Sequence, residues 1–260
     1  MLKKTLITIM IAGTLAGCDM SDKADSLSND EIGQIAANYL VEHPEVLIKV
    51  SEALKKQQTE KYTAEIAAKA LSQMDALIND KTSPVIGSEK PKVRIVEFFD
   101  YQCLYCKQLA PGLKQLVDDN KDVQLVLKET PIFGSRWEAS KYAAEMGLSI
   151  YQQKGSAAYE KYHNALLEST IEESKLTHAD VDKFAEAAGA NPKEMASHEE
   201  GKSPIDKNLN LFMDLGFRGT PALIIIPDGA KDIKDIKVIA GADIDAIKAA
   251  VEQASKMSKT

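Results

Sequence analysis

Two cysteines separated by two residues constrain the fold of this 260-residue sequence more than any other feature. Cys103 and Cys106 follow a run of β-branched and aromatic residues over 93–99, which predicts a buried strand. They open residues 104–119, whose apolar spacing predicts a helix. A cysteine at the start of a helix lies among free backbone N–H groups, where the helix dipole favours its thiolate. We therefore expect a strand and a helix to meet around a reactive thiol.

The remaining segments alternate between strand-like and helical patterns in an order that indicates an α/β fold. Short apolar runs predict three more strands, and helical spacing predicts a block of helices and a closing helix. The strands are expected at 123–127, 222–226 and 236–240, the helical block at about 135–215, and the closing helix at 243–256. The order is β-α-β, the helical block, then β-β-α, with no internal repeat.

The spacing of the two cysteines favours thiol–disulfide exchange. A lowered thiol pKa makes Cys103 a nucleophile near neutral pH, and the two-residue spacer lets Cys106 resolve a mixed disulfide. A zinc site would need four ligands, and no histidine is nearer in sequence than His163. A structural disulfide across so short a loop would stabilise little, because the gain grows with loop length. The exchange is expected to need no metal and no organic cofactor.

Three segments around the pair resemble the DsbA family of thioredoxin-fold proteins. They are Phe98-Phe99-Asp100-Tyr101-Gln102-Cys103-Leu104-Tyr105-Cys106-Lys107, Ala110-Pro111 and Gly219-Thr220-Pro221-Ala222. The resemblance implies a thioredoxin fold with a helical insertion, and it makes residues 87–260 the catalytic domain. It also implies that Cys103 and Cys106 are the catalytic pair.

The resemblance further implies which residues meet the substrate. Leu104 and Tyr105 lie between the cysteines, and Leu104 departs from the Pro or Gly that the family more often has. Thr220 and Pro221 resemble the cis-proline loop of the superfamily, closest to the Thr-Pro form of the isomerases DsbC and DsbG. A cis bond there would turn backbone groups toward the cysteines, where a peptide can pair as an added strand.

Glu97 is the one acidic residue inside the first predicted strand, six residues before Cys103. The resemblance makes it the buried acid beneath the cysteine pair. A carboxyl in such a strand is desolvated, which raises its pKa, and it can then exchange protons with Cys106. The alternative is that Glu97 points to solvent from a half-exposed strand. The four histidines are scattered over helical and loop segments, and surface or capping positions are expected for them.

The first residues predict export and lipid attachment. Residues 1–17 have the basic start and short apolar run of a signal peptide, too short to span a bilayer. The run ends in Leu15-Ala16-Gly17-Cys18, which resembles the lipobox of bacterial lipoproteins. We therefore expect acylation of Cys18 and a lipidated tether over 18–27. Asp19 indicates the periplasmic face of the inner membrane in an enterobacterial host. A plain secretory signal is the alternative.

Residues 28–86 predict a helical arm before the catalytic domain. Ser28 and Glu31 form a possible capping box, and apolar residues then recur at helical spacing. The run His43-Pro44-Glu45-Val46-Leu47 resembles the oligomerisation arm of the suppressor-of-copper-sensitivity (ScsC) proteins. An apolar stripe on a long helix needs a partner, so we expect a homo-oligomer. Folding back onto its own domain is the alternative.

These features predict an oxidoreductase that forms, isomerises or reduces disulfides in exported proteins, with isomerase favoured by the arm and Thr220. The insertion favours the oxidase direction, and the redox partner is expected to be a membrane protein of DsbB or DsbD type. The alternative is a non-catalytic periplasmic chaperone, or a copper-stress protein that holds copper(I) between the cysteines. The net charge of −7 and the lack of a basic stripe give no support to nucleic-acid binding.

Overall fold

The protein is represented by a computed structural model that describes residues 27–194 and 203–258. Its contacts divide the chain into two compact units, Met1–Lys55 and Lys56–Thr260. The expectation of an α/β fold with a helical insertion and a helical N-terminal region is confirmed by the order of its elements. The expected signal peptide, most of the tether and Cys18 lie outside the described residues.

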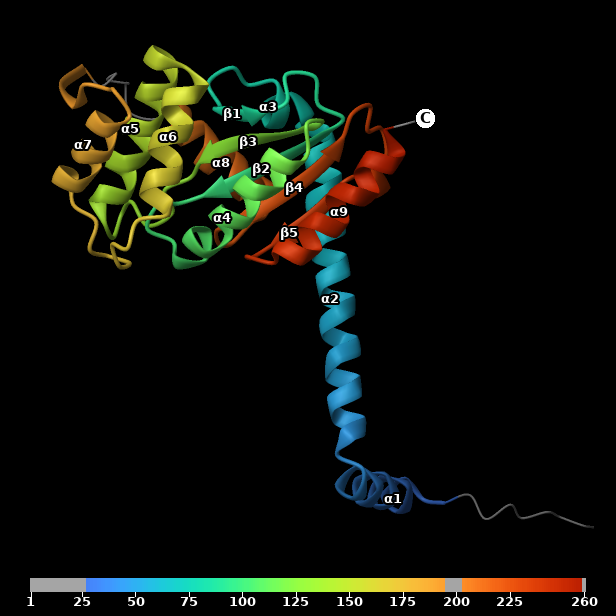
Figure 1. The fold of residues 1–260 in the computed structure, drawn as a ribbon. Coiled ribbons are helices and arrows are strands. Elements are labelled where there is room, and N and C mark those ends of the chain that lie inside the picture. Colours follow the sequence, from blue (N-terminus) through green and yellow to red (C-terminus); the bar gives the residue numbers. More distant parts are fainter. Residues whose placement is uncertain (1–26, 195–202, 259–260) are drawn as a thin grey trace, which may run out of the picture. The chain divides into compact units, whose positions relative to one another are not determined.

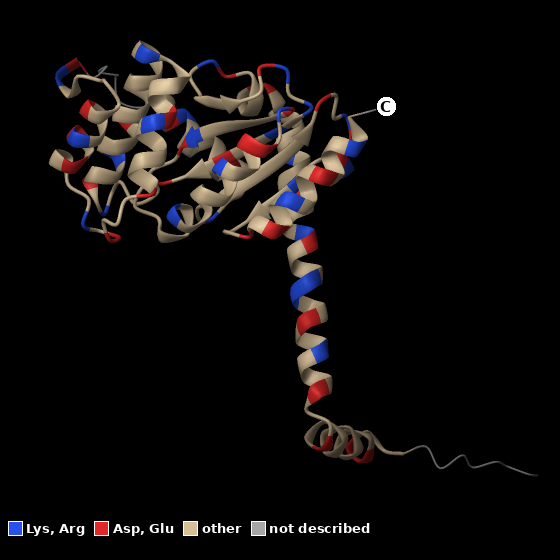
Figure 2. Ribbon diagram, in the orientation of Figure 1, with Lys and Arg blue, Asp and Glu red and all other residues tan. Residues whose placement is uncertain are grey.

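The described part of the first unit is helical. Helix α1, Asn29–Glu42, begins with the predicted capping box: the Ser28 side chain accepts from the Glu31 N–H, and Glu31 Oε2 accepts from the Ser28 N–H at 2.8 Å. Helix α2, Glu45–Ser72, begins in this unit and continues into the next. Figure 2 shows acidic residues on α1 and charges of both signs along α2.

A mixed five-stranded sheet forms the centre of the second unit (Figure 1), in the order β1-β3-β2-β4-β5. The strands are β1 Val85–Gly87, β2 Val93–Phe99, β3 Val123–Glu129, β4 Ala222–Pro227 and β5 Lys237–Ala240. Strands β2 and β3 pair in parallel, and the other neighbours are antiparallel. The four predicted strands are confirmed, whereas β1 was missed.

The helices of the second unit follow the predicted order. They are α3 Met74–Ile78, α4 Leu104–Asp119, α5 Glu138–Lys154, α6 Ser156–Leu167, α7 His178–Ala187, α8 Pro204–Leu215 and α9 Ile244–Met257, with short 3-10 turns η1 Pro192–Glu194 and η2 Ile233–Asp235. Among the described residues of the insertion, from α5 to α8, there is no strand, as expected.

Both faces of the central strands are buried, and each face has its own core. On β2, Ile95 and Phe99 pack against α4, α9 and the helices α5, α6 and α7. Val96 and Phe98, which point the other way, pack against the end of α2, α3 and α8. This two-sided burial explains why β2 and β4 are apolar at nearly every position rather than at alternate ones.

The arm is shorter than the predicted 28–86, because residues from 56 onward belong to the second unit. Ile66 and Ala70 of α2 and Leu77 of α3 are buried against the sheet. The Tyr62 hydroxyl donates to the Gly216 carbonyl at 3.1 Å, which fixes α2 at the end of α8. The apolar spacing of α2 was read correctly, but its later turns cover the sheet within the same chain.

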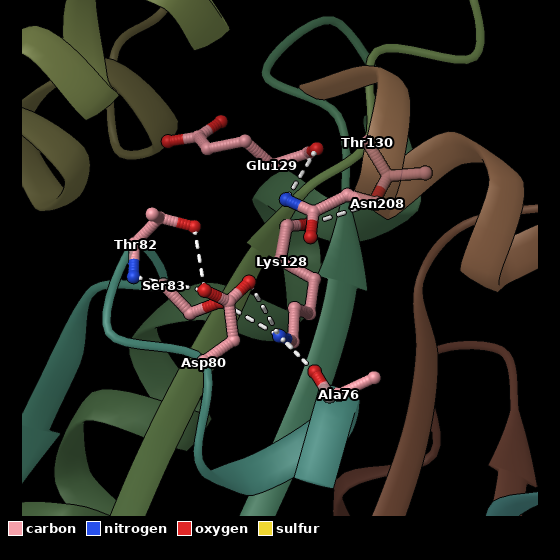
Figure 3. A network of polar contacts seen from close by, with 8 residues as sticks. All are labelled: Ala76, Asp80, Thr82, Ser83, Lys128, Glu129, Thr130 and Asn208. Carbon is pink, nitrogen blue, oxygen red and sulfur yellow. Dashed lines mark hydrogen bonds and ion pairs between the residues drawn. The ribbon is translucent and has the colours of Figure 1, made fainter. Parts of the chain in front are cut away.

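Lys128 ties the segment between α3 and β1 to the sheet. Its side chain has no exposed surface, and its ammonium donates to the Ala76 carbonyl at 2.7 Å and to Ser83 Oγ at 2.6 Å (Figure 3). Asp80 lies 3.7 Å away as its ion-pair partner. Burial lowers the pKa of Lys128 to about 8, and Asp80 opposes that shift. Three contacts from one short segment thus hold a buried amine in place.

Candidate active site

Cys103 and Cys106 lie at the first turn of α4, directly beyond β2. Cys103 is the N-cap residue, in an extended conformation, and its N–H donates to the Asp100 carbonyl at 3.0 Å. Cys106 lies inside the helix. Both are free thiols; Cys106 has no exposed surface and Cys103 retains 4%. Cys103 is thus the more accessible of the two thiols, although most of it is buried.

The surroundings lower the pKa of the Cys103 thiol and raise that of the Cys106 thiol. A hydrogen bond from Cys106 is the main cause that lowers the pKa of Cys103 to about 6, against the opposing effect of burial. Thr220 and backbone N–H groups at the start of α4 lower it further. Burial raises the pKa of Cys106 well above its ordinary value. Near neutral pH the pair therefore contains one thiolate and one thiol.

The loop before β4 closes over the first cysteine. The Thr220–Pro221 peptide bond is cis, as the family resemblance implied. In its protonated form, the Cys103 thiol donates to the Thr220 carbonyl at 3.2 Å. Thr220 Oγ1 is buried without a hydrogen-bond partner among the described residues. Leu104 and Tyr105, which follow Cys103 in the chain, have 48% and 60% of their surfaces exposed, and large apolar side chains left open at a site suit contact with a polypeptide.

Glu97 lies on the face of β2 that packs under α4. Only 2% of it is exposed, so the solvent-facing alternative is excluded. Burial is the main cause that raises its pKa to about 8, and the Cys103 thiolate raises it further. Glu97 lines a cavity of about 20 Å³, enough for one water molecule, together with Lys114, Glu160 and His163. The carboxyl thus has room to exchange a proton while it remains out of bulk solvent.

Six of the seven expected site residues lie together in the structure, and the seventh, Glu97, lies beneath them. They are Cys103, Leu104, Tyr105, Cys106, Thr220 and Pro221. A reactive thiol at a helix start, a second thiol behind it and a cis-proline loop against both are the constellation of thioredoxin-fold exchange proteins. Residues 94–252 match the family described as "DSBA-like thioredoxin domain". The chain belongs to this DsbA-like family of thiol–disulfide oxidoreductases.

The DsbA-like domain is preceded by a second match. Residues 29–61 match the family described as "Copper resistance protein ScsC N-terminal domain". This match covers α1 and the first half of α2, so the resemblance of the arm is confirmed. No curated protein sequence matches the chain.

Three solved structures show how far the similarity extends. BcfH of Salmonella enterica Typhimurium is 33% identical with a TM-score of 0.70, and the match covers 87% of this chain and 95% of that one. A periplasmic thioredoxin-like protein of the same organism is 31% identical, with a TM-score of 0.59 and coverages of 70% and 95%. The catalytic domain of Proteus mirabilis ScsC is 27% identical, with a TM-score of 0.62 and coverages of 73% and 98%.

Two residues that shape this DsbA-like site were not predicted from the sequence. Asp100 is buried and holds the loop before Cys103: its carboxylate accepts from the N–H groups of Gln102 and Phe133 and from the Ser140 hydroxyl. His163 was placed at the surface, which is wrong, because only 3% of it is exposed. Its spacing of four from Tyr159 and three from Leu166 puts it on the buried face of α6 and was the available signal.

Membrane attachment is not addressed by the described residues. Cys18 lies outside them, and within 27–194 and 203–258 no helix is both long and apolar enough to cross a bilayer.

Proposed function

We propose that the protein exchanges thiols and disulfides in exported proteins, with Cys103 as the attacking thiol, Cys106 as the resolving thiol and Glu97 as the proton acceptor. The observation that carries the proposal is the split between the cysteines, since Cys103 has a pKa lowered to about 6 and Cys106 has one raised well above its ordinary value. A nucleophile that is ionised near neutral pH and a partner held as a thiol are what an exchange cycle requires.

The cycle follows from these protonation states. The Cys103 thiolate attacks a substrate disulfide; a Cys103–substrate S–S bond forms, the substrate S–S bond breaks, and the second substrate sulfur leaves as a thiolate. The mixed disulfide removes the Cys103 charge that helps to raise the pKa of Glu97, so the acid ionises more readily. In its carboxylate form Glu97 takes the proton of Cys106, and Cys106 attacks Cys103. The Cys103–Cys106 disulfide forms, the Cys103–substrate bond breaks, and the first substrate sulfur leaves as a thiolate, so two electrons have passed to the substrate. In isomerisation another substrate thiolate attacks the substrate sulfur of the mixed disulfide instead: a new S–S bond forms within the substrate, the Cys103–substrate bond breaks, and Cys103 leaves as a thiolate, so the pair is reduced again.

The direction that we favour is isomerisation, with reduction as its companion. Thr220 before the cis proline and an arm with exposed apolar side chains support this choice. An isomerase needs a reduced pair, which a membrane reductant of DsbD type would maintain, whereas an oxidase would be reoxidised by a partner of DsbB type. Exported proteins with cysteines are the substrates, because disulfides form and persist outside the cytosol.

We propose that the protein works in the periplasm, attached to the inner membrane through lipid on Cys18. The signal-like start, the lipobox and the periplasmic relative in Salmonella support this location. Mass spectrometry of protein extracted from membranes tests the anchor. A lipid mass on Cys18 is expected, and soluble protein that begins at another residue without that mass contradicts it.

The arm is proposed to join copies of this chain. Helix α1 exposes Ile32, Ile35 and Tyr39 by half or more of their surfaces, and with Leu40 they line a wholly apolar hollow. Such a set of exposed side chains on a helix that has no buried residue indicates association. The similarity of residues 29–61 to an ScsC N-terminal domain supports the same reading.

Mixed-disulfide trapping tests the roles of the cysteines. The Cys106→Ala protein should retain substrates as mixed disulfides on non-reducing gels, because nothing resolves them from Cys103. The Cys103→Ala protein should retain none and should not reduce insulin. The reverse pattern means that the roles are exchanged. A wild-type protein that shows no insulin reduction, and that binds copper(I) through the pair, supports the binding alternative instead.

A further inference from the structure

A second buried carboxyl, Glu129 at the end of β3, lies on the same face of the sheet as Glu97. It has no exposed surface. Its Oε1 accepts hydrogen bonds from Tyr101 Oη at 2.9 Å and from Tyr159 Oη at 2.7 Å. Its Oε2 has no hydrogen-bond partner among the described residues. The exchange cycle proposed above gives this acid no role, although Tyr101 lies only two residues before Cys103.

Tyr101 connects Glu129 to the cavity beside Glu97. Its hydroxyl has one hydrogen, which it donates to Glu129. The 3.4 Å contact between Tyr101 Oη and His163 Nδ1 is therefore one in which the histidine donates. This contact holds His163 in the tautomer protonated at Nδ1, and His163 itself lines the cavity that Glu97 faces. Burial lowers the pKa of His163 to about 3, so the ring is neutral.

The packing of α5 is built around the same cluster. A Cβ at Gly147 would lie 2.7 Å from Glu129 Oε1 and 3.2 Å from Tyr101 Oη. Only a glycine lets the helix come this close to the two polar atoms. Helix α5 therefore packs tightly against Glu129 and Tyr101 and leaves no space between them.

The groups around Glu129 indicate that it is neutral. Tyr101, Tyr159, Tyr162 and His163 face it from the loop after β2 and from α6, and the nearby acids are Asp100 and Glu97. Burial raises the pKa of Glu129 well above its ordinary value, and both acids raise it further, while the two hydroxyls oppose the shift. A proton on Oε2 also explains why a buried oxygen without a partner is tolerated there.

We propose that Glu129 is a positioning residue of the redox site: its neutral carboxyl fixes Tyr101, Tyr101 fixes His163, and His163 determines which hydrogen bonds the cavity offers to Glu97. The proposal rests on the proposed role of Glu97 as the proton acceptor. Without Tyr101 Oη, His163 is free to change tautomer and donate into the cavity. A donor there stabilises the Glu97 carboxylate and makes it a weaker base.

Two matched substitutions test this chain of contacts. Tyr101→Phe and Tyr159→Phe each remove one hydroxyl from Glu129, but only Tyr101 also bonds His163. The ¹³C chemical shift of glutamate carboxyls, followed by NMR against pH and assigned with Glu97→Gln, reports the titration of Glu97 directly. In Tyr101→Phe its midpoint should fall by roughly one pH unit, a tenfold change in proton affinity, and in Tyr159→Phe it should stay where it is. Equal shifts in both variants, or none in Tyr101→Phe, overturn the proposal.

Glu129 itself is tested by a conservative and a disruptive variant. Glu129→Gln keeps an oxygen for both tyrosines and carries no charge, so the Glu97 midpoint should match that of the wild type. Glu129→Leu removes the acceptor and should lower the midpoint as Tyr101→Phe does. A lower midpoint in Glu129→Gln would mean that a negative charge has been removed, which contradicts a neutral Glu129. The titration needs no turnover, so failure of the proposed function shows separately, as a wild-type protein that does not reduce insulin.

Discussion

Tyr105, the second residue between the cysteines, is expected to influence how strongly the site oxidises. A phenol carries no positive charge, whereas a protonated histidine at this exposed position would stabilise the Cys103 thiolate. Tyr105→His should therefore bring the pKa of Cys103 below its value of about 6 and make the disulfide more oxidising. A fall of one pKa unit corresponds to about 30 mV. Thiolate absorbance against pH and equilibration with glutathione measure both quantities. Tyr105→Phe is the control, and an equal change in that variant rules out the charge as the cause.

Glu97 should make the folded protein less stable as pH rises. Its pKa is about 8 in the folded state and near 4.5 when exposed, so between these values the folded state binds more protons than the unfolded state. Stability then falls by roughly 1.4 kcal/mol per pH unit through this group. Urea denaturation of a Cys103→Ala, Cys106→Ala background, with and without Glu97→Gln, isolates the effect. The Gln variant should show a flatter profile between about pH 5 and 8, and parallel profiles would contradict a raised pKa.

At the scale of elements, the sequence predicted the strands that are buried on both faces and the helices that cover them. Runs such as 222–226 have no polar interruption, and their partners are long enough to show helical spacing. Strand β1 was missed because it has three residues and exists only through its antiparallel pairing with β3. The extent of the arm was overestimated because an apolar stripe looks the same whether it meets another copy or its own sheet.

The candidate site also has one part that could be predicted before the structure and one part that could not. The cysteine pair is a short motif with a chemical meaning of its own, whereas Glu97 and the Thr220 loop were placed beside it by the family resemblance. The cluster of Tyr101, Glu129 and His163 has no such motif, because its members are 28 and 62 residues apart and are joined only by tertiary hydrogen bonds. Residue type and spacing carry no information about which hydroxyl reaches which carboxylate.

The contact between α5 and the sheet should be intolerant of even one methyl group. Gly147→Ala places a Cβ 2.7 Å from Glu129 Oε1 and 3.2 Å from a ring carbon of Tyr159, so the helix or both side chains must move. A loss of about 1–3 kcal/mol in the free energy of unfolding is expected, despite the better helix propensity of alanine. Gly33→Ala in α1 is the control, because no atom of the described residues outside its own helix backbone lies within 4 Å of the added Cβ, and it should be neutral or stabilising. If the two variants change the free energy of unfolding by similar amounts, the packing around Gly147 can rearrange to accept a methyl group.

At the scale of the whole molecule, the boundary at Lys55 predicts where the arm can be removed. Deletion of residues 19–55 should leave a folded monomer that reduces insulin as the full chain does but refolds scrambled ribonuclease poorly, because isomerisation is proposed to need the joined copies.

The longer deletion, of residues 19–86, should give a chain that does not fold. It removes Ile66 and Leu77 from the core and leaves the Lys128 amine without its contacts to Ala76, Asp80 and Ser83. An unpaired buried charge alone costs about 3–5 kcal/mol, a large part of the stability of a domain. Light scattering, circular dichroism and the two assays compare the three proteins. A full-length chain that is monomeric at micromolar concentration, or a shorter chain that isomerises as well as the full one, contradicts the role of the arm, whereas a folded 19–86 deletion contradicts the boundary.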